Sequence, residues 1–298
     1  MLTYQQSFIG GMQVALLLSS AMWGITSLQM ATYYRKFQQD FQLLKILVGV
    51  IWVFDTVYIV CIACAFYEMT VLDVNSDKIP LVMSAGAGVA SVVQSLVQAV
   101  YAFRLYRLLK NIYIPALCWI AASYNFAAGI AFDCITANQP KARFVQLERE
   151  FQWLLSSLYS ATAAVDVVIT VTLCYILLKK RSGAPRRTIN ILDHLILYTI
   201  QTGLITSIVA ILIVVLFDTI QQPGIWISLT IVITTLYPTT LITMLNGRSV
   251  LLRNLPHQDS SGGLSTVCIT TVPESHLSAS VLERDTAQTK SSANLDEC

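Results

Sequence analysis

Two aspartates stand alone within long apolar stretches of this 298-residue chain, and they have the clearest capacity for chemistry. Asp55 is the single charged residue between Ile46 and Tyr67, and Asp166 is the single one between Phe151 and Leu178. If these stretches lie in hydrocarbon, no lysine or arginine is at hand to pair with either carboxyl group. Each must then be protonated, hydrogen-bonded to neutral groups, hydrated in a cavity, or bound to a cation or a ligand amine.

Other polar side chains fall at similar depths and could line a central cavity together with the aspartates. Gln94 and Gln98 are four residues apart, so one helix orientation points both toward the same neighbour. The candidates for ligand or cavity residues are Asp55, Gln94, Gln98, Asn125, Asp166, Gln201 and Tyr237, with Thr202 and Thr206 beside them. Hydrogen bonds that merely hold a helix bundle together would use the same residues, including neutral carboxyls. Both interpretations remain open at this level.

The elements that must position these residues are membrane-spanning helices. Hydrophobic residues make up 55% of the chain, charged residues 12%, and the mean hydropathy is +0.63. Seven apolar intervals are each long enough to cross about 30 Å of hydrocarbon as a helix, whereas buried helices of a soluble protein need only roughly 10–14 residues. We therefore predict an all-α, polytopic bundle over residues 1–250. Its seven transmembrane helices are expected at about 8–33, 45–68, 80–104, 112–135, 151–178, 193–217 and 224–246.

Lysine and arginine are unevenly shared between the two ends of these helices, which predicts an orientation. Thirteen of these basic residues lie in or beside the segments that follow the first, third, fifth and seventh predicted helices. Four lie at the opposite ends of the helices. The richer side should be cytoplasmic, so we expect the N-terminus outside and the C-terminus inside. We expect a multi-pass protein of the plasma membrane rather than of an internal membrane.

A basic rim on the cytoplasmic side could receive an acidic partner or anionic lipid. Its members would be Arg104, Arg107, Lys179, Lys180, Arg181, Arg186, Arg187 and Arg248. The general bias of basic residues toward the cytoplasm would place many of them there without any partner. Residues 251–298 are rich in serine and threonine and poor in large apolar residues, which predicts a disordered cytoplasmic tail. Such a tail could be a phosphorylation platform for a regulator or an inert extension.

Several classes of function are disfavoured. The chain has three histidines and lacks a P-loop, a His-Glu-x-x-His motif and a Gly-x-Ser-x-Gly motif, so we expect no enzyme and no cofactor. Cys61 and Cys64 have no second Cys/His pair, so no metal centre is expected. The formal net charge of +2 is too small to suggest nucleic-acid binding. The seventh predicted helix has no lysine, which excludes a retinal Schiff base of the rhodopsin kind there.

Short motifs are spread along the whole membrane region. They are Gly24–Gln29 with Tyr33, Tyr34 and Asp40, then Asp55-Thr56, Gln98–Arg104, Asp166–Thr170, Thr202–Thr206, Leu236-Tyr237 and Leu245–Arg248. In order and spacing they resemble a large fungal, chiefly basidiomycete, family of seven-helix integral membrane proteins whose shared domain is of unknown function. Tyr58 stands where members of that family often have a histidine, and Gly247 where they have an alanine. The resemblance implies a seven-helix membrane fold and a role for both aspartates, and it implies no established activity.

Three functions fit these features. Helix number, orientation and tail composition favour a receptor-like protein that senses a small ligand in a cavity near Asp55, Gln94 and Asp166. Unpaired carboxyls near the middle of the membrane would also suit a small-solute or proton-coupled transporter. A structural or lipid-organising membrane protein is the third alternative. The expected partners are the lipid bilayer, a small-molecule ligand, and a cytoplasmic regulator at the basic loop and tail.

Overall fold

The computed structural model describes residues 2–38, 42–72, 80–109, 112–138, 150–181, 186–219 and 223–253, and these residues form seven α-helices and no strand. The helices are α1 (Leu2–Lys36), α2 (Gln42–Tyr67), α3 (Leu81–Leu108), α4 (Tyr113–Asn138), α6 (Gln152–Arg181), α7 (Arg186–Thr219) and α8 (Pro223–Arg253). A π-helical turn, η1 (Glu68–Leu72), extends α2. The chain divides into two units, Met1–Ser261 and Gly262–Cys298, and the second lies outside the described residues. The all-α prediction is confirmed.

Six of these helices are long and apolar enough to cross a membrane: α1, α2, α3, α4, α6 and α8. In α7 the apolar part found among the described residues is shorter and runs from Gly203 to Thr219. Several helices exceed their predicted bounds, since α7 begins at Arg186 rather than near 193 and α8 continues to Arg253 rather than ending near 246. The predicted ranges are those of the apolar segments, and backbone hydrogen bonding continues the helices beyond them.

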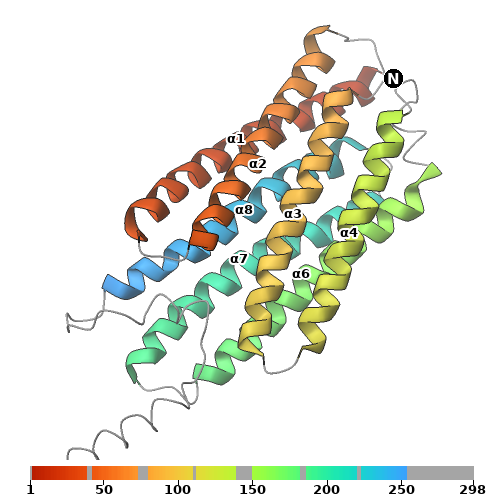
Figure 1. Cartoon of the computed structure of the whole chain (residues 1–298). Coiled ribbons are helices and arrows are strands. Elements are labelled where there is room, and N and C mark those ends of the chain that lie inside the picture. The colour runs from red at the N-terminus through yellow and green to blue at the C-terminus, as the bar shows by residue number, and fades with distance from the viewer. Residues whose placement is uncertain are drawn as a thin grey trace, which may run out of the picture. The chain divides into compact units, whose positions relative to one another are not determined.

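The seven helices of the first unit close into a ring. Going around it, α1 packs on α2, α2 on α3, α3 on α4, α4 on α6, α6 on α7, α7 on α8, and α8 back on α1. Figure 1 shows α1 and α8 running lengthwise beside each other, with α3 next to α4. Helix α3 is a member of this ring and also contacts α6 and α8 across its interior. Side chains of α3 can therefore meet partners from most of the other helices.

The bundle is apolar on its outward faces and polar in parts of its interior. Large apolar side chains such as Leu28, Leu117 and Val171 are more than 60% exposed, whereas Asp55 and Asp166 are buried. Soluble proteins show the opposite distribution, because water solvates polar groups and excludes apolar ones. With six apolar helices of sufficient length, this distribution is that of a multi-pass integral membrane protein.

Hydrogen bonds between side chains and neighbouring helices fix α1 against α2 and α8. Two bonds join α1 to α2: Trp23 Nε1 donates to Thr56 Oγ1 and Trp52 Nε1 donates to Ser27 Oγ, both at 2.9 Å. Two contacts join α1 to α8: Asn246 Nδ2 donates to the Gln29 carbonyl at 2.7 Å, and the hydroxyls of Thr26 and Thr239 are 2.7 Å apart. In a membrane, where lipid is as apolar as leucine, such bonds and close packing hold helices together. They set the register of α8, which carries part of the site described next.

Candidate functional site

Two glutamines of α3 face α6 and pair with it in register. Gln94 Nε2 donates to Thr162 Oγ1 at 3.2 Å, and one turn further Gln98 Nε2 donates to Asp166 Oδ1 at 3.5 Å. Both pairs advance along the two helices in the same direction, so α3 and α6 run parallel here. The four-residue spacing that predicts a shared face for the glutamines is therefore matched by a four-residue spacing of their partners.

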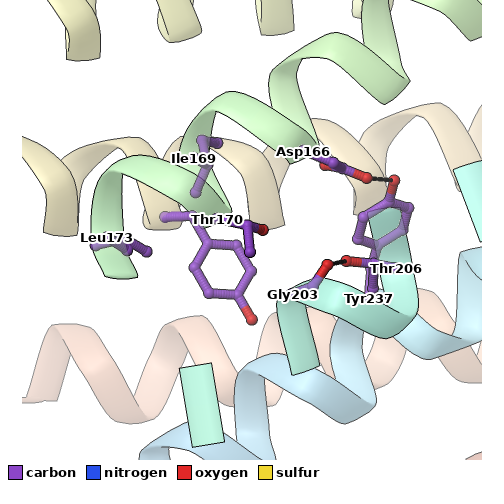
Figure 2. A pocket seen from close by; sticks show the side chains of 8 residues that line it. Asp166, Ile169, Thr170, Leu173, Gly203, Thr206 and Tyr237 are labelled. Atoms are coloured by element: carbon purple, nitrogen blue, oxygen red, sulfur yellow. Dashed lines mark hydrogen bonds between the residues drawn. The ribbon is translucent and has the colours of Figure 1, made fainter. Parts of the chain in front are cut away.

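Helix α8 supplies a second partner for Asp166. The Tyr237 hydroxyl donates to Asp166 Oδ2 at 2.5 Å, and Figure 2 shows the tyrosine side chain directed at the carboxyl group. Asp166 is 6% exposed and Tyr237 is 2% exposed. Each oxygen of the carboxyl thus accepts a hydrogen bond from a different helix, which offsets part of the cost of its burial. We call Gln98, Asp166 and Tyr237 the Asp166 cluster.

A small cavity of about 30 Å³ lies beside the Asp166 cluster, between α3, α6, α7 and α8 (Figure 2). Its polar lining comes from Asp166, Thr170, Thr206, Tyr101 and Tyr237. A space of about 10–15 Å³ holds one water molecule, so this cavity has room for about two. Hydroxyl groups on its walls provide the hydrogen-bonding partners that such water requires.

Helix α7 reaches this cavity because it approaches α6 unusually closely. A Cβ atom at Gly203 would lie 2.5 Å from Thr170 Oγ1 and 2.6 Å from its Cγ2, which is closer than atoms can pack. Glycine at this position lets the two backbones come together, as small residues do at helix contacts in membranes. Thr206, one turn further on α7, donates to the Gly203 carbonyl at 3.1 Å and forms part of the cavity wall.

Asp55 is placed differently from Asp166. It is fully buried, and neither of its carboxyl oxygens has a hydrogen-bonding partner among the described residues. It shares the buried face of α2 with Ile51 and Tyr58, and Ile51 packs in the same cluster as Tyr237. A buried carboxyl without a partner is costly and unusual, so this position calls for a proton, a water molecule or a ligand.

A larger cavity of about 170 Å³ lies between α2, α3, α4, α6 and α8. Its walls are mainly apolar and include four aromatic side chains, Tyr58, Phe132, Tyr159 and Trp226. The polar wall residues are Ser91, Gln94, Asp133, Thr230 and Thr234, in addition to the tyrosine hydroxyls. Sites for small molecules have this composition, with an apolar surface and a few polar groups that fix orientation.

The larger cavity and the buried polar residues are neighbours along the helices. Tyr58 in the wall is one turn from Asp55 on α2, Gln94 is one turn from Gln98 on α3, and Thr234 is one turn from Tyr237 on α8. On α6, Tyr159 is two turns from Asp166. The larger cavity therefore lies about 5–11 Å along these helices from the polar interior.

Asp133 is a residue that the sequence prediction missed. It lies in the wall of the larger cavity, and its Oδ2 atom is buried without a hydrogen-bonding partner among the described residues. The sequence does not predict it as a cavity residue, because it directly follows a charge-free interval and lies close to the predicted helix end near 135. Helix α4 in fact continues to Asn138. Spacing is the signal that the sequence offers, because Asp133 is four residues from Gly129 and three from Thr136. The structure shows that these two residues are buried on the same helix.

The remaining cavity candidates differ in where they lie. Asn125 is buried on α4, and its side-chain amide has no partner among the described residues, but it lines neither of the two cavities. Gln201 is exposed on α7 and is not among the described residues that line either cavity. Thr206 lines the small cavity, while the side chain of Thr202 lies outside the described residues.

The predicted basic rim is described only in part. Arg104 departs from it, because its side chain is 7% exposed and a guanidinium nitrogen donates to Met244 Sδ of α8. A long arginine stem can lie along a neighbouring helix in this way. Arg107 is exposed and stacks over the Phe103 ring at 5.4 Å, and Lys179 is also exposed. The side chains of Lys180, Arg181, Arg186, Arg187 and Arg248, and the tail from 254 to 298, lie outside the described residues.

Comparison with known protein families finds a match for one segment of the chain. A domain of unknown function (DUF6534) is found at residues 162–250, which cover most of α6, all of α7 and most of α8. The segment contains Asp166, Gly203, Thr206 and Tyr237, so it includes much of the Asp166 cluster and its small cavity. Neither a search of curated proteins nor a search of solved structures finds a match. The fungal origin and the seven-helix family membership suggested by the motifs remain predictions.

Proposed function

We propose that the chain is a receptor-like protein of the plasma membrane, which binds a small ligand in the larger cavity and transmits its occupancy to the Asp166 cluster. In this proposal α7 joins the other six helices in crossing the membrane. The N-terminus is outside and the C-terminus cytoplasmic, as the distribution of lysine and arginine predicts. The proposal assigns no reaction and no cofactor to the protein.

The larger cavity is the observation that carries this proposal. An apolar protein cavity of about 150 Å³ is known to hold benzene, so about 170 Å³ suits a molecule with one aromatic ring and a few further atoms. Ligand sites in helix bundles commonly lie between the helices, as this cavity does. In the proposed orientation it lies in the outer half of the membrane, because it is near the first residues of α3 and the last of α2.

The contacts between α3 and α6 offer a route from the cavity to the interior. Gln94 belongs to the cavity wall and donates to Thr162, so a ligand that displaces its side chain changes this contact. The next contact along the same two helices is the bond from Gln98 to Asp166. Packed helices shift between discrete arrangements rather than deform gradually, so a change at the first contact alters the second.

The proposal can be tested by thermal unfolding of the full-length protein in dodecyl maltoside, with 2-phenylethanol and 2-phenylethylamine as probes. A ligand at a hundredfold excess over its Kd stabilises the folded state by about 2.7 kcal/mol. We expect a rise in Tm with at least one probe. The rise should vanish in Ala90→Phe, which fills the cavity, and persist in Ala127→Phe, which adds the same bulk to an exposed position on α4. An unchanged Tm with both probes would contradict the proposal.

A transporter is the second candidate, and Asp55 is the observation that favours it. Its fully buried carboxyl lacks a partner among the described residues, and one turn away Tyr58 reaches the larger cavity. Such a group could carry a proton with a solute. Saturable uptake of labelled probe into proteoliposomes, lost in Asp55→Asn, would support transport. Binding without uptake would support the receptor-like function.

A further inference from the structure

Among the described residues that line the larger cavity there is one formal charge and no counter-charge. Among the described residues that line it, Asp133 is the only acidic or basic one. Its Oδ2 atom is buried and accepts no hydrogen bond from any described residue. An isolated carboxylate in such surroundings is expensive, and the cost falls sharply when a cation with hydrogen-bond donors occupies the cavity.

Close packing of α3 and α4 brings this carboxyl group to the cavity. A Cβ atom at Gly129 would lie 2.6 Å from Ser91 Oγ, so glycine is needed for the two helices to approach. One turn further along α4, Asp133 Oδ2 lies against α3 at Gly88, where a Cβ atom would be 3.7 Å away. The close approach of α3 and α4 at these two glycines thus brings Asp133 Oδ2 to the cavity wall, where this atom has no hydrogen-bonding partner among the described residues.

The aromatic side chains in the cavity walls suit the rest of a cation. Tyr58, Phe132, Tyr159 and Trp226 come from four different helices and line the same space. Tyr159 and Trp226 pack edge to face, with ring centroids 5.8 Å apart, and Phe217 supports both from α7. Aromatic rings attract ammonium groups through their negative faces and also pack against apolar ligand atoms.

From this arrangement we infer that the larger cavity binds a small organic ammonium ion with an aromatic or apolar body, and that Asp133 is its counter-ion. The inference rests on the proposed function, since it names the ligand class of the same cavity. An ammonium group can come from a free amine or from the headgroup of phosphatidylethanolamine. The two sources share the chemistry that Asp133 would recognise.

The test compares 2-phenylethylamine with 2-phenylethanol, which has nearly the same shape and no charge. Binding to the full-length protein in dodecyl maltoside is measured by titration calorimetry. We expect the amine to bind about tenfold more tightly than the alcohol, because a charge-assisted hydrogen bond replaces a neutral one. In Asp133→Asn this preference should fall to about twofold or less, with binding of the alcohol retained.

Controls separate this inference from the proposed function. Asp218→Asn removes an exposed carboxyl of α7 and should leave the preference for the amine unchanged. Added phosphatidylethanolamine that competes with the amine, while phosphatidylglycerol with the same chains does not, would identify the lipid headgroup as the source; no competition would identify a free amine. Equal binding of amine and alcohol, or a preference that survives Asp133→Asn, would overturn the inference and leave the proposed function standing. Failure of both probes to bind would overturn both.

Discussion

The bond between Tyr237 and Asp166 should make a measurable contribution to the stability of the bundle. Its length of 2.5 Å and the burial of both side chains place it among strong hydroxyl–carboxyl hydrogen bonds. Hydrogen bonds to charged groups contribute about 1.5–3 kcal/mol in soluble proteins, while double-mutant cycles between membrane helices average about 0.6 and reach about 1.7 kcal/mol. For a short and fully buried pair we expect a coupling energy of about 1–1.5 kcal/mol.

A double-mutant cycle with Tyr237→Phe and Asp166→Ala, each of which removes one partner of the bond, measures this coupling energy directly. The free energy of unfolding is obtained from denaturation in mixed micelles, followed by the helical circular dichroism signal. Tyr175→Phe, on the same helix as Asp166 but 64% exposed, is the matched control and should change the free energy by less than about 0.5 kcal/mol. A coupling energy below about 0.3 kcal/mol, with both variants folded, would refute the view that this bond joins α6 to α8.

Three further predictions concern the packing, the second aspartate and the orientation. Gly203→Ala should lower the free energy of unfolding by about 1–3 kcal/mol, because the added methyl group clashes with Thr170. In the control Gly24→Ala the added methyl group has nothing within 4 Å, so the free energy should stay unchanged or rise by up to about 1 kcal/mol. Equal losses for the two variants in mixed-micelle denaturation would argue against close packing of α6 and α7. Asp55→Leu should stabilise the bundle by about 1 kcal/mol or more, because it removes a buried carboxyl that has no partner among the described residues; a clear loss of stability in the same assay would mean that Asp55 has a stabilising partner. An epitope at the N-terminus should be labelled on intact cells and one at the C-terminus only after permeabilisation, and the reverse pattern would invert the proposed orientation.

Much of the fold follows from the spacing of charges along the chain. The apolar runs coincide with the seven helices of the described residues, because a segment that lies in hydrocarbon tolerates few charged residues along its length. Helices α7 and α8 extend beyond the predicted apolar ranges, since helical hydrogen bonding does not stop where polarity begins. The shared face of Gln94 and Gln98 also followed from spacing alone, and both donate to α6.

The partners of these residues could not be predicted, because they depend on the packing of helices that are distant in sequence. Asp166 and Tyr237 are 71 residues apart, and their contact depends on how α6 and α8 are rotated. Gln201 illustrates the same limit, since its polarity suggested an inward position and the rotation of α7 exposes it. The charge of Arg104 alone predicts a position in the basic rim. The structure shows that its side chain is buried and contacts Met244 of α8.

The structure also explains the motifs spread along the sequence. Both members of several contacts between helices belong to them: Gln29 with Asn246, Gln98 with Asp166, and Asp166 with Tyr237. Their order and spacing are therefore those of a network of hydrogen bonds that sets the positions of α1, α3, α6 and α8. Asp133 belongs to none of these motifs, which fits a role in binding a particular ligand rather than in building the fold.

The link between the larger cavity and the Asp166 cluster can be tested most directly by infrared difference spectroscopy of the reconstituted protein. Spectra are recorded with and without saturating 2-phenylethylamine or 2-phenylethanol, and Asp166→Asn identifies the carboxyl band. We expect ligand binding to shift a carboxyl band that is missing in Asp166→Asn, because displacement of Gln94 alters the hydrogen bond from Gln98 to Asp166. Saturated binding with no Asp166 band in the difference spectrum would contradict this expectation.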